Sequence, residues 1–177
     1  MNINKTTHSI LFNFLLSGTM LCLVATAYAQ APGTHCKGGE KNIISFKIVK
    51  SKKIASVCEG SNAEYLVYRF GSTEKVELEY PKNLNKEAWS KFQYSGYIRG
   101  GGLANDAMGD YRLSFSNNGT EYIIFQNWRL SSNEYGLGIF VGMGKSSVVL
   151  QADKDTQSGS LELLNGNPQI KNAWNYE

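Results

Sequence analysis

The chain has 177 residues and a formal net charge of +3. This length fits one domain with a sizeable core. So small a charge provides no field that would indicate DNA or RNA as a partner. Beyond residue 29 the sequence holds one histidine, His35, and two cysteines, Cys36 and Cys58. These are too few for a zinc site without several carboxylates, so we expect no metal and no cofactor.

The first 29 residues have the pattern of a secretory signal peptide. Lys5 precedes a largely apolar run, Ile10–Val24, and Ala27-Tyr28-Ala29 supplies the small residues that a signal peptidase reads. A membrane anchor is the alternative, but the run is short and interrupted. We expect cleavage after Ala29, a single β domain over residues 30–177, a periplasmic or secreted location, and no membrane insertion after cleavage.

Export predicts a disulfide between Cys36 and Cys58, because two cysteines in an oxidising compartment usually pair. Closing this loop would stabilise the fold by about 3 kcal/mol. If the first turn centres near Lys52, Cys58 lies opposite about Ser45. The bridge would then tie the arm before the first strand onto the sheet.

Short runs with period two and turn residues between them predict an all-β fold. Asn42–Lys50 and Lys75–Tyr80 alternate between apolar and polar residues, as strands with one buried face do. Asn117-Asn118-Gly119 predicts a tight hairpin. Further strands are expected at Ile54–Cys58, Tyr65–Phe70, Tyr111–Ser116, Glu121–Trp128, Tyr135–Val141, Ser146–Gln151 and Ser160–Leu164.

The predicted fold is thus a single antiparallel meander of about eight strands, forming a small barrel or a two-sheet sandwich. The middle of Glu121–Trp128 is apolar on both faces, as in a central, doubly covered strand. At most one short helix is expected, over Leu84–Phe92.

Two segments resemble functional motifs only superficially. Val141–Ser147 contains G-K-S, but Ile139 stands where a phosphate-binding loop needs its first glycine, and no helix is expected to follow. Asp153–Gly159 lacks the central glycine and the terminal glutamate of a calcium loop. With His35 near the new N-terminus, no base is well placed for a serine or cysteine nucleophile. We expect no enzymatic activity.

The segment Lys91–Gly102 has the composition of a contact surface. Tyrosine and arginine bury area and also form hydrogen bonds, and consecutive glycines favour a protruding loop, Gly100–Gly109. The alternative is that Phe92, Tyr94 and Ile98 are core positions of another strand. The residues expected to bind a partner are Tyr94, Ser95, Tyr97, Arg99, Gly100, Gly101 and Gly102.

Four lysines gather around the first expected hairpin: Lys47, Lys50, Lys52 and Lys53. They are suited to an anionic polymer or an acidic partner. Solubility and protection of an edge strand explain them equally well, and the sequence does not decide between these interpretations.

The chain resembles an uncharacterised family of small secreted or periplasmic β-proteins of Gram-negative bacteria. The resemblance rests on the signal peptide, the early cysteine pair and the segment E-Y-L-V-Y-R-F-G-S-T-E-K-V-E-L-E-Y-P around Tyr65–Tyr80. It implies a periplasmic β-fold and no particular activity. Tyr94-Ser95-Gly96-Tyr97 also resembles, loosely, an element of the periplasmic lysozyme inhibitors, which block an enzyme's cleft with loop residues.

Together these observations predict a periplasmic protein that binds and neutralises a protein target, such as a lysozyme, another cell-wall hydrolase or a toxin. The alternative is a carrier that holds a small apolar ligand inside a barrel lined by Phe115, Phe125 and Trp128. An inhibitor needs a filled core and a projecting loop, whereas a carrier needs an internal cavity.

Overall fold

The computed structural model describes residues 33–173, so the expected signal peptide lies outside the described residues. Within this range the chain forms ten strands and three short 3₁₀ helices. The strands are β1 (Lys41–Ile48), β2 (Ile54–Glu59), β3 (Leu66–Gly71), β4 (Val76–Tyr80), β5 (Gln93–Arg99), β6 (Met108–Asn117), β7 (Thr120–Arg129), β8 (Glu134–Met143), β9 (Ser146–Gly159) and β10 (Lys171–Asn172). The helices are η1 (Ser61–Ala63), η2 (Lys86–Lys91) and η3 (Leu161–Leu164).

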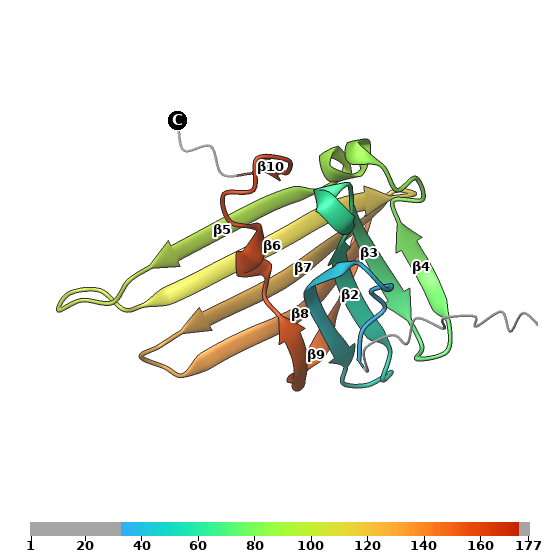
Figure 1. Ribbon diagram of the computed structural model, residues 1–177. Helices are drawn as coiled ribbons and strands as arrows, with labels where there is room; N and C mark the ends of the chain where they lie inside the picture. The colour runs from blue at the N-terminus through green and yellow to red at the C-terminus, as the bar shows by residue number, and fades with distance from the viewer. Residues whose placement is uncertain (1–32, 174–177) are drawn as a thin grey trace, which may run out of the picture.

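All ten strands belong to one sheet, in the order β10-β5-β6-β7-β8-β9-β1-β2-β3-β4. It consists of two antiparallel meanders, β1–β4 and β5–β9, which join where β9 pairs with β1. The sheet curls into an open half-barrel (Figure 1). The all-β prediction is therefore confirmed, but the single eight-stranded meander closed as a barrel or stacked as a sandwich was wrong.

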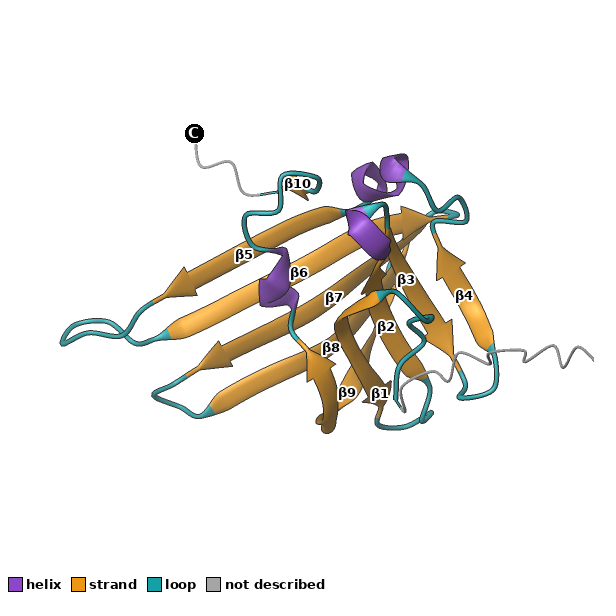
Figure 2. Ribbon diagram, in the orientation of Figure 1, coloured by secondary structure: helices purple, strands orange, loops and turns teal. Residues whose placement is uncertain are grey.

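Two local features explain the difference. β4 lies at one edge of the sheet and β5 near the other, so the two do not pair, and the chain between them carries Pro81 and η2. The short β10 instead joins the outer edge of β5 in parallel, through Lys171 and Asn172. Figure 2 shows the resulting layout of the strands and the helical turns.

The core lies inside the curl, where the inner faces of the two meanders meet. A column of stacked rings spans it: Phe115 of β6 lies 4.8 Å from Tyr122 of β7 and 4.5 Å from Tyr80 of β4, measured between ring centroids. Tyr68 and Phe92 pack against Phe115 at 5.1 and 5.5 Å. Aromatic packing thus links the two halves of the sheet where backbone hydrogen bonds do not.

The local turn predictions had mixed outcomes. Asn118 and Gly119, with φ of 50° and 75°, form the two-residue turn between β6 and β7, as predicted. The expected helix over Leu84–Phe92 is the shorter η2, and Asn85 caps it by accepting a hydrogen bond from the Glu87 amide at 3.0 Å.

The predicted last strand, Ser160–Leu164, was wrong: this segment contains η3. The side chain of Gln126, buried on the inner face of β7, accepts hydrogen bonds from the Leu161 amide at 2.9 Å and the Ser160 hydroxyl at 3.1 Å. These bonds hold the start of η3 against the sheet and bury Leu161 and Leu164 inside the curl.

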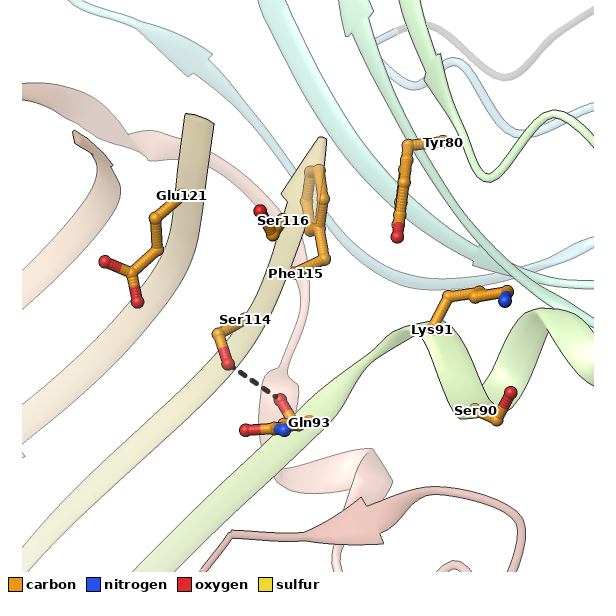
Figure 3. Close-up of a pocket in the computed structure, with 8 residues that line it drawn as sticks. All are labelled: Tyr80, Ser90, Lys91, Gln93, Ser114, Phe115, Ser116 and Glu121. Carbon is orange, nitrogen blue, oxygen red and sulfur yellow. Dashed lines mark hydrogen bonds between the residues drawn. The ribbon is translucent and has the colours of Figure 1, made fainter. Parts of the chain in front are cut away.

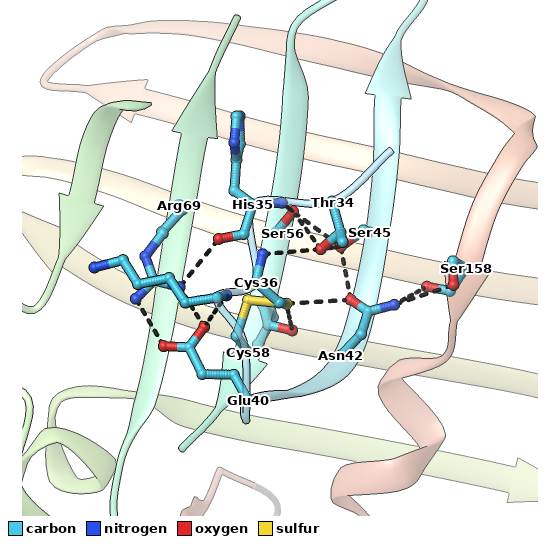
Figure 4. The surroundings of a disulfide bond; sticks show 12 residues. Thr34, His35, Cys36, Glu40, Asn42, Ser45, Ser56, Cys58, Arg69 and Ser158 are labelled. Atoms are coloured by element: carbon cyan, nitrogen blue, oxygen red, sulfur yellow. Dashed lines mark hydrogen bonds and ion pairs between the residues drawn. A yellow bond between two sulfur atoms is a disulfide. The ribbon is translucent and has the colours of Figure 1, made fainter. Parts of the chain in front are cut away.

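The Cys36–Cys58 disulfide is confirmed, with a Cα–Cα distance of 5.5 Å. It ties the arm that precedes β1 onto the outer face of the sheet, as expected (Figure 4). The register differs from the expectation, since Cys58 lies opposite Asn42 and Ser45 pairs with Ser56. The turn is centred between Lys50 and Ser51, before the expected Lys52, and the irregularity between Asn42 and Ile44 shifts Cys58 by one further residue.

A buried arginine holds the same arm. Arg69 of β3 is fully buried on the outer face and donates to both carboxylate oxygens of Glu40, at 2.6 and 2.9 Å. It also donates to Glu79 of β4 at 2.7 Å and to the His35 carbonyl at 3.2 Å. Each of these bonds is charge-assisted on the donor side, and together they satisfy most of the guanidinium's donors.

Arg69 lowers the pKa of both carboxylates that it contacts, Glu40 and Glu79. Burial alone raises the pKa of Glu40, but hydrogen bonds from Arg69, the Lys37 amide and Tyr65 outweigh it and hold the pKa below its usual value. Burial also raises the pKa of Glu79, and again the hydrogen bond and charge of Arg69 bring the pKa below its usual value. Both groups are therefore ionised in the folded protein near neutral pH.

The disulfide fits an exported protein, since such bonds persist in oxidising compartments. None of the helical segments within residues 33–173 has the length and apolar character that crossing a membrane requires.

We expect the Arg69→Met substitution to destabilise the protein by about 3–5 kcal/mol, because Glu40 would remain buried without its partner. Urea unfolding measures this change. The matched control is Arg112→Met, which removes an arginine that pairs with Asp110 at the surface. Its expected cost is below about 1 kcal/mol. Equal effects of the two substitutions would contradict the structural role of Arg69.

Acid should weaken the fold in a defined range. Because Glu40 and Glu79 have lowered pKa values in the folded state, their contribution is complete above the usual value of 4.5 and is lost as pH falls through the lowered values. The free energy of unfolding, measured by urea titration at successive pH values, should therefore drop below pH 4.5. Arg69→Met should flatten this dependence, and an unchanged slope would refute the assignment.

Candidate functional site

The expected contact residues on β5 divide into two groups. Tyr94 and Ser95 are only 3% and 6% exposed, and the Tyr94 hydroxyl contacts the Asn165 side-chain oxygen at 2.8 Å. Burial raises the pKa of Tyr94 well above its usual value. Tyr97 and Ile98 are 40% and 54% exposed. The alternative interpretation as a core strand thus applies to the first half of β5, and the second half is available for contact.

The second half of β5 leads into a loop that projects from the body. Figure 1 shows the β5–β6 and β7–β8 connections extending at the same end of the sheet. The β5–β6 loop covers residues 100–107 and is shorter than the expected Gly100–Gly109, because Met108 and Gly109 already pair with β7. Gly100, Gly101 and Gly102 are exposed in this loop.

Hydrogen bonds brace the two projecting connections against each other. The Asp106 carboxylate accepts from the Ser131 amide at 3.0 Å and from the Ser131 hydroxyl. The Leu130 amide donates to the Ala107 carbonyl at 3.0 Å, and Arg99 Nε donates to the Asp106 carbonyl at 2.9 Å. The hydrogen bonds from Ser131 lower the pKa of Asp106, so the bracing carboxylate is charged. The two loops therefore form one structural unit.

Exposed apolar side chains gather on this unit, which we call the projecting end. The sequence pattern identified Tyr97 but not the exposed leucine of the β7–β8 hairpin. Leu130 is 71% exposed, and Leu103 is fully exposed at the loop. An isolated leucine after Arg129 carries no signal of its own, because the pairing of β6 with β7 and the bonds between the two loops place it there. The projecting end comprises Tyr97, Ile98, Arg99, residues 100–107 and residues 130–133.

The lysines of the first hairpin do not act as one free patch. Lys53 pairs with Glu77 at 2.5 Å and lies 5.7 Å from the centre of the Phe70 ring. Lys50 and Lys52 are exposed in the turn, and Lys52 has a φ of 57°. The β1–β2 hairpin lies inside the sheet, because β1 also pairs with β9 and β2 also pairs with β3. The interpretation that these lysines protect an edge strand therefore does not apply.

A polar depression of about 370 Å³ opens where the ring column reaches the surface (Figure 3). Tyr80 and Phe115 form its apolar wall, and Lys91 and Glu121 stand on opposite sides of it. The Ser114 hydroxyl donates to the Gln93 carbonyl at 3.5 Å. The depression is open to solvent, and Ser116 and Glu121 of its lining pair across β6 and β7.

A second depression, of about 430 Å³, lies on the outer face of β6–β9. Phe125 lines it, whereas Phe115 faces the core, so these two residues lie on opposite faces of the sheet. Trp128 packs over Gly109. Phe115 and Trp128 both pack on the core, whereas Phe125 lies on the outer face, so the three residues expected to line a carrier's cavity do not line a common one.

One cluster has the composition of a metal site. Within the described range, Cys36, Glu40 and Cys58 bring their ligand atoms within 4.8 Å of one another. The two sulfurs are bonded to each other, however, and Glu40 is held by Arg69. In the oxidised protein these atoms hold the N-terminal arm on the sheet and are not available to a metal.

No protein-family model, no curated protein and no solved structure matches this chain.

We expect Asp106→Ala to uncouple the two loops and leave the body of the fold intact. The amides of Leu130 and Ser131 should then exchange hydrogen faster, because each is held by the bracing contacts. Exchange measured by NMR tests this, together with a melting temperature that changes little. Asp155→Ala, in the exposed part of β9, is the control and should leave both amides unchanged. Unaltered exchange in Asp106→Ala would show that the loops do not depend on this carboxylate.

Proposed function

We propose that this chain is an extracytoplasmic protein that binds a protein target through its projecting end and neutralises it. The target class is a cell-wall hydrolase, such as a lysozyme, or a toxin of similar action. The observation that carries the proposal is the presence of exposed Tyr97 and Ile98 at the end of β5, and of exposed Leu103 and Leu130 on the two adjoining connections that brace each other.

The side-chain composition of the projecting end supports a protein partner. The centres of protein interfaces are rich in tyrosine and arginine, and anchor residues carry most of the binding energy. Tyr97 and Arg99 supply these types on one face of β5, Ile98 is exposed on the other face, and Leu130 is exposed at the β7–β8 connection. Exposed side chains of this size are otherwise unfavourable when they lie together on a soluble protein.

Bracing supports an inhibitory mode of binding. A projection that is ordered before binding loses less conformational entropy when it enters a cleft. The hydrogen bonds that Ser131 donates to the Asp106 carboxylate and that Arg99 donates to the Asp106 carbonyl provide such order. Hydrolases of polymers have open clefts, and a pair of adjacent loops is a suitable shape to fill one.

Electrostatics contributes little to this interaction. Arg129 and Glu134, which flank the β7–β8 turn, lie 3.9 Å apart, and their charges offset each other. The net charge of +3 provides no steering toward a basic lysozyme. Binding would therefore rest on apolar contact and shape, with a weak dependence on salt.

The test is binding to, and inhibition of, purified lysozymes and peptidoglycan amidases, measured by calorimetry and by turnover of cell-wall substrate. The wild-type protein should bind at least one of them with a micromolar or lower dissociation constant and slow its turnover. Tyr97→Ala combined with Arg99→Ala should weaken binding about tenfold or more, with little change in melting temperature.

Met143→Ala provides a matched control, because Met143 is 64% exposed at the β8–β9 hairpin. It should bind as well as the wild type. If no hydrolase is bound or slowed at micromolar concentration, the proposal fails. A large fall in melting temperature in the double variant would instead assign Tyr97 and Arg99 to the fold.

A further inference from the structure

The outer face of the sheet is covered over one meander and open over the other. The N-terminal arm packs on β1–β3 through Cys36 and Glu40. Over β6–β9 the outer face lines a solvent-open depression, within the described residues, and Val149 there is 45% exposed. β7 therefore presents apolar side chains, Ile123 and Phe125, on the open outer face as well as Ile124 to the core.

Strand pairing arranges this open face in two adjacent rows. One row runs across β6–β9 through Ser114, Ile123, Phe140 and Val149, and the next through Arg112, Phe125, Gly138 and Gln151. Two depressions of about 430 and 230 Å³ follow these rows and share Arg112 and Ile123. Together they form a groove across the strands, of the size that ligand sites have.

Glycines beneath the groove let its aromatic rings lie flat. A Cβ at Gly138 would come within 2.9 Å of the Phe125 ring, and one at Gly142 within 2.8 Å of the Phe140 ring. Glycine weakens a strand, and it commonly marks a place where a ligand or another backbone approaches closely. Here the glycines turn the two rings so that they cover the sheet and form an apolar platform.

Planar polar groups surround this platform. Asn127 lies over Gly136 in the same way, and Gln151 stands at the β9 side. Arg112 contributes a guanidinium whose charge is offset by Asp110, at 2.9 and 3.1 Å. The groove therefore combines ring faces with amide and hydroxyl groups and contains no unpaired charge among its lining residues.

We infer that this groove binds a neutral oligosaccharide. Sugar rings present weakly polarised C–H groups, which pack against the electron-rich faces of aromatic rings, and hydroxyls at their edges, which bond to planar amides. A charged ligand would find no counter-charge here, since Asp110 already offsets Arg112. The site lies on the strands next to the projecting end, one row from Tyr97, and goes beyond the proposed inhibition.

A second copy of the chain fits the groove less well. A stable interface needs about 800 Å² from each partner. The apolar part of this face consists of Ile123, Phe125 and Phe140, which are half-buried already, and the exposed Val149. Self-association through so small an area would be weak, whereas a single oligosaccharide needs no more than the groove provides.

The experiment is an NMR titration of the protein with three hexasaccharides: cellohexaose, chitohexaose and the anionic hexagalacturonate. We expect at least one neutral probe to bind with a dissociation constant of about 1 mM or lower. Amide shifts should centre on Phe125, Gly138 and Phe140. The two neutral arms distinguish a plain glucose polymer from an N-acetylated one.

Phe140→Leu is the decisive variant, because it keeps an apolar side chain on the platform and removes the ring face. Binding should weaken about tenfold, with the melting temperature near that of the wild type. Leu103→Ala, in the fully exposed part of the β5–β6 loop, should leave sugar binding unchanged. Full retention of binding in Phe140→Leu would show that stacking is not the mode of recognition.

Three results would overturn the inference. One is the absence of shifts with both neutral probes at millimolar concentration. Another is binding of hexagalacturonate alone, which would require a charged site. The third is a concentration-dependent dimer, detected by sedimentation, with shifts at Ile123, Phe140 and Val149 in the absence of sugar.

Discussion

The fold depends on one buried arginine. Arg69 lies on the outer face of β3 without solvent contact, and it is held by Glu40, Glu79 and the His35 carbonyl. A desolvated guanidinium is tolerated only when its donors are satisfied, so this position requires the arm to pack across β1–β3. The disulfide acts at the same place and fixes the arm covalently. Together they make the first meander a covered, rigid half of the sheet.

Sequence patterns predicted those strands and turns whose conformation depends only on residues close by in the chain. The alternation along β4 and the tight turn at Asn118-Gly119 follow from local chemistry, and both are present. The order of the strands does not follow from local chemistry, because it depends on β9 pairing with β1 across more than a hundred residues. η3 was missed for the same reason: Ser160–Leu164 alternates like a strand, but Gln126 of β7 binds the Leu161 amide and starts a helical turn.

The candidate site was predicted in part. Tyr97 and Arg99 lie at the projecting end, whereas burial places Tyr94 in the core, and alternation along a strand cannot tell which end of it leaves the body. Leu130 lies at the site because the β7–β8 hairpin extends beside the β5–β6 loop. Glu79 alternates with the apolar residues of β4 as a surface acid does, and nothing near Arg69 in the sequence indicates that this partner is buried. The covered half of the sheet supplies stability, and the open half carries both proposed binding surfaces.

The measurement that tests this account most directly is native-state hydrogen exchange of the His35 amide, followed by NMR in the oxidised protein. This amide donates to the Ser56 hydroxyl at 2.9 Å beneath the arm. If the arm is an integral layer of the fold, the amide should exchange only with a free energy close to that of global unfolding, as the amides of β2 do. Rapid exchange of the His35 amide, with β2 still protected, would show that the arm opens independently and would contradict the central role of Arg69.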